Sequence, residues 1–570
     1  MVKTHARVPV VHFVLALVCI SPIVVGVCAG RSSKPGKTPK VLAVNQITHD
    51  GVNKANLLSD GSSLYINESA GTQRLVARVS LQTSDRSVVQ TTLGNLQALD
   101  ISSDHKSILV SSTASGGSRA NELWTLPVGP GEPVRLAELT SRDAAWSQDG
   151  QLLAFAKESS VDTANADGSS PHEVFQANGS VFAPRVAPDK KRIRFTVSNV
   201  ADNTTQIWEV GIDGSHPHQL LANWANASAA CCGNWSGDGR YYIFQVTQGT
   251  LTTLWAMPDS GASAPVQLTA GPTSFGNLAV SPDNKNIWAI GVQPTAEAVI
   301  YKDQKLTPVL GGVSATDIDF SADGKWAAYV SIPERELWRC RADGSDKLKL
   351  AAAPETAALP RWSPDGTQIA YVRLRQGQPA KIALVSREGG ATQDLLNESR
   401  TQIDANWSED GSRIMIGSVV QDKDINIRVV DLKTRQVEVV PGSHGIFSPR
   451  WSPDGKYIAA LSPDFTKVLL FDYATGEWAT WLSEPAGAVS YPAWSADSKS
   501  LFFDDLVTGV ESIRKAKLGE KKAESVFALP NFDRFQGPFG LWAGRTPDGH
   551  WMFASDRSTQ EVYQLTVSLP

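Results

Sequence analysis

Seven polar residues occupy similar places in a pattern that recurs along the chain, each just before a short apolar strand. They are Asp143, Arg185, Asn234, Asp317, Arg361, Asn406 and Arg450. A guanidinium presents its N–H donors as a planar fork, which suits a carboxylate, a phosphate or a peptide terminus. The alternative is that the arginines form salt bridges between repeats with neighbouring aspartates. We therefore treat the seven residues as candidate binding residues.

Sequence motifs of several enzyme classes are absent from the chain. There is no Gly-x-Ser-x-Gly elbow, no Gly-x-x-x-x-Gly-Lys phosphate loop and no His-Glu-x-x-His. The nine histidines are scattered over the whole length. We expect no catalytic residue, no metal and no cofactor. The alternative is a lyase or hydrolase that acts on a polysaccharide or lactone, which rests on analogy of fold alone.

The five cysteines are too few for a disulfide-stapled scaffold, and none has the Cys-x-x-Cys spacing of a metal site. Cys19 and Cys28 lie in the apolar N-terminal segment. The adjacent pair Cys231-Cys232 has three interpretations: a vicinal disulfide, a soft-metal site, or two half-buried small residues at the start of a strand.

The elements that position these residues come from a repeated strand–turn–strand unit. Its turn is centred on an aspartate, usually followed by glycine, and recurs twelve times from Asp60 to Asp548 at intervals of 40 to 51 residues. In such a turn the carboxylate caps its own backbone and glycine accepts a positive φ. We assign this structural role to Asp149, Asp238, Asp323, Asp365, Asp410 and Asp454. A calcium loop is the alternative, but no copy has the D-x-D-x-D-G pattern.

A period of this length, made of strand signals alone, is typical of propeller blades. We predict an all-β chain of tandem β-propellers with four-stranded blades and almost no helix. Twelve blades divide most simply into two six-bladed propellers, over residues 41–312 and 313–570, and seven plus five blades is the alternative. The segments Leu42–Thr48 and KLTPVL resemble unpaired fourth strands, and we expect each to close the ring that it precedes.

The N-terminus predicts export. Lys3 and Arg7 precede an apolar run from Val8 to Val27, and small residues at 27–29 suit a cleavage site. We predict a signal peptide or membrane anchor over residues 1–29 and a basic Pro/Gly linker over 30–40. The expected location is periplasmic or otherwise extracytoplasmic, either secreted or anchored in the membrane through the N-terminal segment if it stays uncleaved.

The net charge is −5, so the chain has no overall positive field to hold nucleic acid, and we expect no nucleic-acid partner.

The repeat resembles that of TolB-type propellers, whose signature is the W-S-P-D-G turn followed by I-A. The segments NQITHDGVNKANLLSDGSSLYI (45–66), CCGNWSGDGRYYIFQ (231–245), LWRCRADGSDKLKL (337–350) and SPRWSPDGKYIAALS (448–462) also resemble the exported half of membrane-anchored, CadC-like winged-helix regulators. Fewer than ten residues precede the apolar run, so we do not expect the DNA-binding domain of that family. The resemblance implies a propeller fold, export and a sensing or scaffold role.

The sequence thus favours an exported, non-enzymatic double propeller that binds a protein or peptide, including envelope or membrane proteins, at a channel mouth. A third interpretation is the remnant of a regulator that has lost its DNA-binding half.

Overall fold

The structure is a computed structural model that describes residues 38–70, 73–113, 121–420, 422, 424–484, 489–505, 511–530 and 532–570. The expected signal or anchor over 1–29 and all but the end of the expected linker lie outside these residues. The described part contains no helix, and therefore none that is long and apolar enough to cross a membrane.

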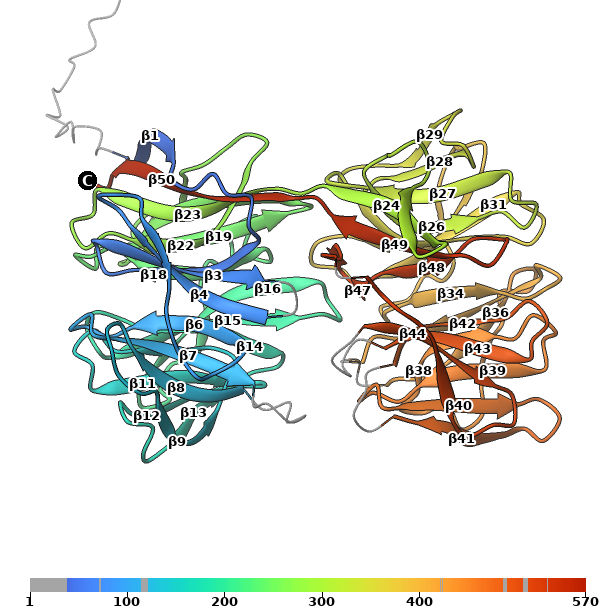
Figure 1. Cartoon of the computed structure of the whole chain (residues 1–570), viewed down its shortest axis with the longest axis horizontal. Coiled ribbons are helices and arrows are strands. Elements are labelled where there is room, and N and C mark those ends of the chain that lie inside the picture. The colour runs from blue at the N-terminus through green and yellow to red at the C-terminus, as the bar shows by residue number, and fades with distance from the viewer. Residues whose placement is uncertain are drawn as a thin grey trace, which may run out of the picture. The chain divides into compact units, whose positions relative to one another are not determined.

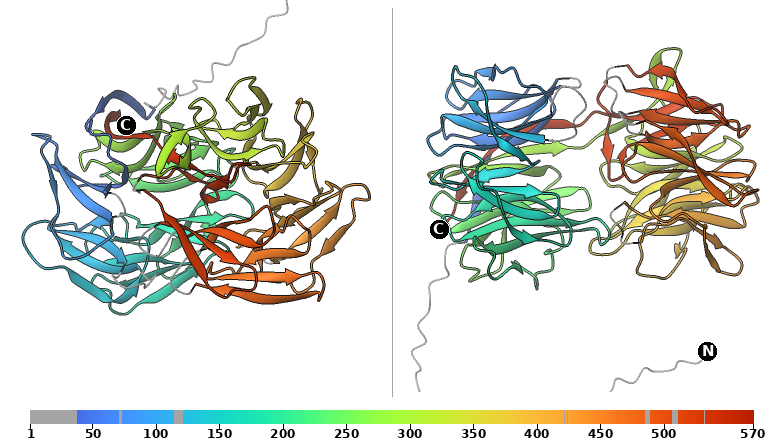
Figure 2. Two further views of the ribbon diagram at one scale, coloured as in Figure 1. Left: turned by 45° about the vertical axis from the view of Figure 1, so that its right-hand side comes forward. Right: turned by 90° about the horizontal axis from the view of Figure 1, so that it is seen from below.

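The described residues form twelve four-stranded antiparallel sheets and one two-stranded sheet. The sheets make two closed rings, here called the first and second propellers (Figures 1 and 2). The prediction of an all-β tandem propeller is confirmed.

The first propeller has five blades made of consecutive strands. Their bounds are β2 (Lys54–Ser59), β3 (Ser63–Ala70), β4 (Gln73–Ser80), β5 (Arg86–Val88); β6 (Leu96–Ile101), β7 (Ser107–Thr113), β8 (Asn121–Pro127), β9 (Val134–Thr140); β10 (Ala144–Trp146), β11 (Leu152–Lys157), β12 (Ser160–Asn165), β13 (His172–Gln176); β14 (Ser180–Val186), β15 (Arg192–Asn199), β16 (Thr204–Gly211), β17 (His218–Gln219); β18 (Ala230–Trp235), β19 (Tyr241–Gln248), β20 (Leu251–Pro258) and β21 (Val266–Gln267). The sixth sheet has the order β22 (Ser274–Val280), β23 (Asn286–Gln293), β50 (Thr559–Ser568), β1 (Lys40–Gln46). The inner strands contact one another in turn, and β22 returns to β2, which closes the ring around a channel.

The second propeller follows the same plan. Its consecutive blades are β26 (Ala315–Phe320), β27 (Trp326–Ser331), β28 (Leu337–Arg341), β29 (Leu348–Ala351); β30 (Thr356–Trp362), β31 (Gln368–Leu374), β32 (Lys381–Ser386), β33 (Gln393–Asp394); β34 (Ile403–Trp407), β35 (Arg413–Gly417), β36 (Arg428–Asp431), β37 (Val437–Val439); β38 (Phe447–Trp451), β39 (Tyr457–Leu461), β40 (Lys467–Asp472), β41 (Glu477–Ser483); β42 (Val489–Trp494), β43 (Ser500–Asp505), β44 (Ser512–Lys517) and β45 (Ala523–Ala528). The closing sheet has the order β48 (Ala543–Arg545), β49 (Trp551–Asp556), β24 (Ala296–Lys302), β25 (Lys305–Pro308), and the short β46 (Gln536–Gly537) and β47 (Gly540–Leu541) pair beside it.

The two closing sheets correct the expected domain boundary at residues 312 and 313. Strand β24 precedes that boundary but pairs with β49, and β25 lies on its other side in the same sheet. Strand β50 follows the boundary but pairs with β23 and β1 (Figure 1). The two rings thus exchange strands: β24 and β25, which follow β23 in the chain, complete the second ring, and β50, which follows β49, completes the first. The prediction that Leu42–Thr48 and KLTPVL supply outer strands of the closing sheets is confirmed, because β1 and β25 are the outer strands of those sheets. The expected boundary is wrong because each ring is completed by strands from both halves of the chain.

The core lies between successive blades. The fully buried large aromatic side chains include one on the second strand of eight blades: Tyr65, Phe155, Phe195, Phe244, Tyr329, Tyr371, Phe503 and Phe553. Burial of one such side chain stabilises the fold by about 1.5–3 kcal/mol. The third-strand tryptophans, such as Trp124 and Trp208, are only half-buried.

The aspartate turns share one set of hydrogen bonds. In the six turns named above, a serine Oγ donates to the aspartate Oδ1 at 2.6–2.7 Å, and the same oxygen accepts the N–H of the residue two positions on. The following glycine has φ between 66° and 71°. The serine bond, the backbone N–H bond and the glycine conformation together stabilise the tight turn between the inner strand and the second strand of the blade.

Candidate binding sites in the two channels

The inner strands carry a bulge that sets the direction of the channel side chains. In eight blades a residue with φ near +50° interrupts the register, at Ala183, Cys232, Asn277, Asp317, Leu359, Asp404, Ser448 and Tyr491. A bulge re-aims the side chains that flank it. The channel wall therefore has two rows of side chains, one at the bulge and one two residues later.

The seven predicted residues belong to both rows. Asp317 is a bulge residue and Asp143 aligns with that row, whereas Arg185, Asn234, Arg361, Asn406 and Arg450 stand in the later row. The expected position before the strand is correct for Asp143 alone. The other six residues lie within their inner strands, which extend past the bulge toward the N-terminus. The structure brings Asp143, Arg185 and Asn234 to the first channel and the other four to the second.

In the first channel, a cavity of about 280 Å³ is lined by all three predicted residues. Arg185 Nη1 lies 3.9 Å from Asp143 Oδ1, and Asp143 Oδ2 accepts the N–H of Ala183 at 2.8 Å. Burial raises the pKa of the Asp143 carboxyl, and the positive charge of Arg185 opposes this shift. Asp143 therefore joins two adjacent blades.

The adjacent cysteines also reach this first channel. Cys231 and Cys232 form a disulfide in β18, and Cys232 lines the cavity, whereas Cys340 is a buried free thiol. Of the three interpretations of this pair, the structure has the vicinal disulfide. No group of three or more metal-ligating side chains occurs in the part of the chain that the structure describes.

In the second channel, the charged residues pair across the blades. Arg450 Nη2 lies 3.1 Å from Asp404 Oδ1, and the two side chains are 11% and 9% exposed. Asn406 Nδ2 donates to the carbonyl of Pro449 at 2.9 Å. Burial lowers the pKa of Arg450, and the Asp404 carboxylate opposes this shift. This geometry matches the salt-bridge alternative for Arg450.

Arg361 and two aspartates form a second group in this channel. Asp317 Oδ2 accepts the N–H of Leu359 at 3.2 Å, and Asp319 Oδ2 accepts that of Trp362 at 2.8 Å. Burial raises the pKa of Asp319 to about 6, against the opposing effects of Arg361 and the Trp362 N–H. Each carboxylate thus holds the backbone of the next blade.

The three predicted arginines share one conformation. Arg185, Arg361 and Arg450 each donate from Nη1 to the carbonyl of the proline before them, at 2.8 Å. Their guanidiniums are therefore partly satisfied by the protein itself, and a role in binding a ligand stays a prediction.

A mainly apolar cavity of about 290 Å³ adjoins the Arg450–Asp404 pair. Its lining includes Val200 of the first propeller together with Leu359, Ile403, Val419, Val420, Phe447, Leu461, Phe465, Tyr491, Pro538 and Phe539. Phe447 and Phe465 pack edge to face, with ring centroids 5.1 Å apart, and Tyr491 Oη donates to the carbonyl of Phe539 at 2.9 Å. Neither this cavity nor that of the first channel has a histidine among its lining residues.

Sequence reasoning missed Asp100, whose Oδ2 accepts the N–H of Trp146 in the next blade at 2.8 Å. It also missed Asp319, Asp404 and Tyr491. Each of these residues stands two or four positions before the serine of the aspartate turn that follows it. Counting back two and four positions from the serine of every turn would therefore have found both rows of channel residues.

The chain matches no protein-family model. It is 26% identical over 212 residues to the uncharacterized peptidase YuxL of Bacillus subtilis, which covers 36% of this chain and 31% of that protein. It is 31% identical over 149 residues to a TolB homologue of Chlorobium luteolum, which covers 25% of this chain and 33% of that protein. The chain thus spans about a third of the length of these two relatives.

Among solved structures, a putative TolB from Agrobacterium tumefaciens aligns with 47% of this chain and 98% of its own, at a TM-score of 0.37 and 19% identity. Sheet topology and the TolB homologue together give this chain a TolB-like propeller fold.

Proposed function

We propose that this chain is an extracytoplasmic, non-enzymatic double propeller that binds a protein or peptide partner, and that the apolar cavity beside the Arg450–Asp404 pair receives part of that partner. The observation that carries the proposal is the cavity itself. An apolar pocket with a few polar groups at its wall is the usual form of a binding site. At about 290 Å³ it has room for one or two apolar side chains.

Phe465 is the exposed part of this cavity. Its side chain is 36% exposed although it contacts Phe447, so an apolar surface remains in contact with water. Covering that ring with a partner's side chain would remove apolar surface from water and favour binding. The neighbouring Arg450–Asp404 pair offers polar groups that orient the partner.

The binding role is favoured over the enzymatic alternative by the composition of the cavities. The lining residues supply carboxylates and arginines that are already engaged with other blades, and they supply no histidine. The match to a peptidase covers 31% of that protein. The net charge of −5 supports the absence of a nucleic-acid partner.

The test is crosslinking in intact cells, followed by capture of the protein and mass spectrometry. Phe465→Glu places a charge in the cavity and leaves the buried ion pairs intact. Arg450→Ala, by contrast, would remove the buried pair with Asp404. The control is Val526→Glu, since Val526 is 45% exposed on β45 and does not line the cavity. We expect a partner that both the wild type and the control capture and that Phe465→Glu loses. Capture that is unchanged in Phe465→Glu, or absent from folded and exported wild type, would overturn the proposal.

A further inference from the structure

One tryptophan of the second propeller departs from the pattern of its neighbours. The indole N–H groups of Trp362, Trp407 and Trp494 each donate to a carbonyl on the inner strand of the preceding blade, at 3.0–3.1 Å. The acceptors are Asp319, Arg361 and Arg450. Trp451 instead donates to the hydroxyl of Tyr473, in its own blade, at 3.1 Å. Its indole N–H therefore makes no hydrogen bond to the blade of β34–β37.

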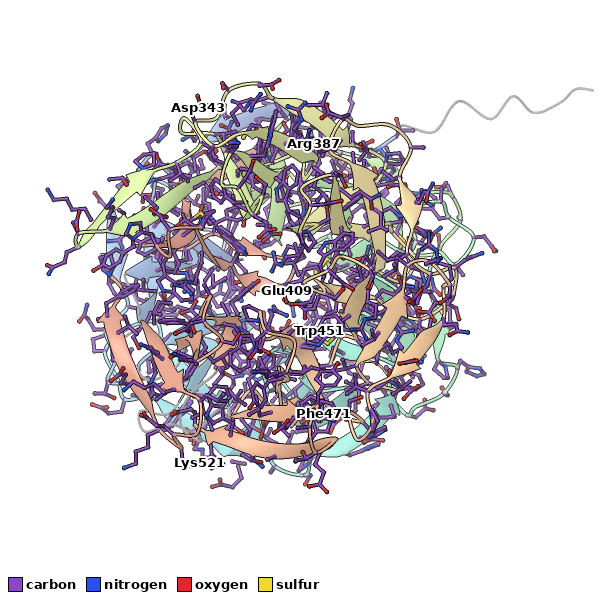
Figure 3. The ribbon with its side chains drawn as sticks, turned by 90° about the vertical axis from the view of Figure 1, so that its right-hand side faces the viewer. Asp343, Arg387, Glu409, Trp451, Phe471 and Lys521 are labelled. Atoms are coloured by element: carbon purple, nitrogen blue, oxygen red, sulfur yellow. A yellow bond between two sulfur atoms is a disulfide. The ribbon has the colours of Figure 1, made fainter. Side chains whose placement is uncertain are left out.

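A groove lies where that hydrogen bond is missing. Its volume is about 1010 Å³, and it is lined by the turns of the β34–β37 and β38–β41 blades together with Trp407, Trp451 and Tyr473. Glu409 and Trp451 are labelled on this face of the second propeller in Figure 3. The sequence changes at the same place, because Glu409 stands in its turn where Pro364 and Pro453 stand in the turns on either side.

The groove combines aromatic faces with two charged side chains, Glu409 and Arg413. Tyr473 is 43% exposed, and the Arg413 guanidinium lies 5.5 Å from the centre of the Trp451 ring. Among the described residues, neither the Glu409 carboxylate nor the Arg413 guanidinium has an ion pair or a side-chain hydrogen bond. Asp410, by contrast, is occupied by Ser408 and Ser412 of its own turn.

We propose that this groove binds a neutral oligosaccharide. The apolar C–H face of a sugar ring packs on an exposed aromatic ring. A carboxylate accepts two hydrogen bonds and a guanidinium donates several in a planar fork, so each matches a pair of sugar hydroxyls.

The charges argue for this class of ligand. Glu409 and Asp410 disfavour an anion, and Arg413 disfavours a cation. A proline-rich peptide would use the aromatic rings but would leave Glu409 and Arg413 without partners. The site is separate from the apolar cavity and goes beyond the proposed function.

The test uses the full chain and two probes, cellotetraose and the tetramer of N-acetylglucosamine. Titration is followed by calorimetry and by tryptophan fluorescence, because Trp451 and Trp407 line the groove. We expect at least one probe to bind, and its Kd to rise about tenfold or more in Glu409→Ala and in Tyr473→Ala. Glu524→Ala, an exposed substitution on β45, is the matched control and should leave the Kd unchanged.

Three outcomes would overturn the inference: no binding of either probe at millimolar concentration by folded protein, an unchanged Kd in both variants, or binding of a proline decamer that the same variants abolish. Thermal unfolding of each variant verifies its fold. The Phe465→Glu capture experiment tests the other site, so each proposal can fail independently.

Discussion

Lys54 Nζ lies 3.4 Å from Glu561 Oε2, although the two residues stand near opposite ends of the chain. The Lys54 side chain is completely buried and that of Glu561 is 12% exposed. Glu561 also accepts hydrogen bonds from Thr48 Oγ1 and from the N–H of Gly51. The loop between β1 and β2 is thereby fixed to β50, at the point where the first propeller closes.

We expect Glu561→Ala to lower the free energy of unfolding by about 3–5 kcal/mol, because it leaves a buried ammonium with only Asp50 as a carboxylate partner. Chemical denaturation measures this change. Lys106→Ala, which breaks the exposed pair with Asp104, is the control and should cost about 0–1 kcal/mol. Equal effects of the two substitutions would show that the closing ion pair has no special role.

A second prediction tests the strand exchange. Leu565 of β50 and Met552 of β49 are both fully buried, and each substitution to alanine should cost about 2–5 kcal/mol. Leu565 packs with Phe275 and Ile287 of the first propeller, whereas Met552 belongs to a cluster of the second. Hydrogen exchange should therefore quicken in β22 and β23 for Leu565→Ala, and in β48 and β24 for Met552→Ala. Faster exchange of β48 in Leu565→Ala would contradict the exchanged topology.

The blade pattern could be predicted from sequence because it is local. The Ser363-Pro364-Asp365-Gly366 turn carries its own hydrogen bonds, and its strands are adjacent in the chain. The pairing of β50 with β23 could not be predicted this way. Apolar residues occur in the third strands of both rings, so the sequence does not distinguish which ring β24 or β50 completes.

The candidate site was predicted only in part for a similar reason. The repeat spacing in the sequence was sufficient to identify Arg361 and Arg450. The bulges at Leu359 and Ser448, which set the direction of the channel side chains, depend on how each inner strand pairs with the next strand. The hydrogen bond of the Trp451 indole depends on Tyr473, a residue outside the repeat motif. Sites that arise where one blade differs from the others need the three-dimensional structure.

A third prediction concerns the turns. Asp365→Ala removes the acceptor of Ser363 Oγ and of the Thr367 N–H. We expect a loss of about 1–2 kcal/mol, since these bonds are partly exposed. Thermal unfolding checks the change, with Thr434→Ala, in a surface turn of another blade, as a comparison of smaller expected effect. No change in Asp365→Ala would mean that glycine alone determines the turn.

The last prediction concerns pH. The pKa of Asp319 is about 6 in the folded protein and 3.8 as the ordinary value, so the folded state holds this proton more tightly than the unfolded state does. The stability contributed by the protonated carboxyl is present below about pH 4 and is lost as the pH rises through about 6. Asp504, whose pKa is also about 6, acts in the same direction. We therefore expect Asp319→Asn, which still accepts the Trp362 N–H, to lose less stability than the wild type between these pH values.

The measurement is the free energy of unfolding from denaturant titrations at a series of pH values, with exposed Asp303→Asn as the control. The slope should flatten in Asp319→Asn and stay at the wild-type value in Asp303→Asn. A wild-type slope in Asp319→Asn would mean that this carboxyl is ionised in the folded channel at pH 5. The positive charge of Arg361 would then stabilise the Asp319 carboxylate, and the channel would carry one more fixed negative charge at this pH. The charged Asp319 carboxylate would then repel an anionic group of a partner near Arg361. The same titration therefore also tests whether the second channel can bind an anion.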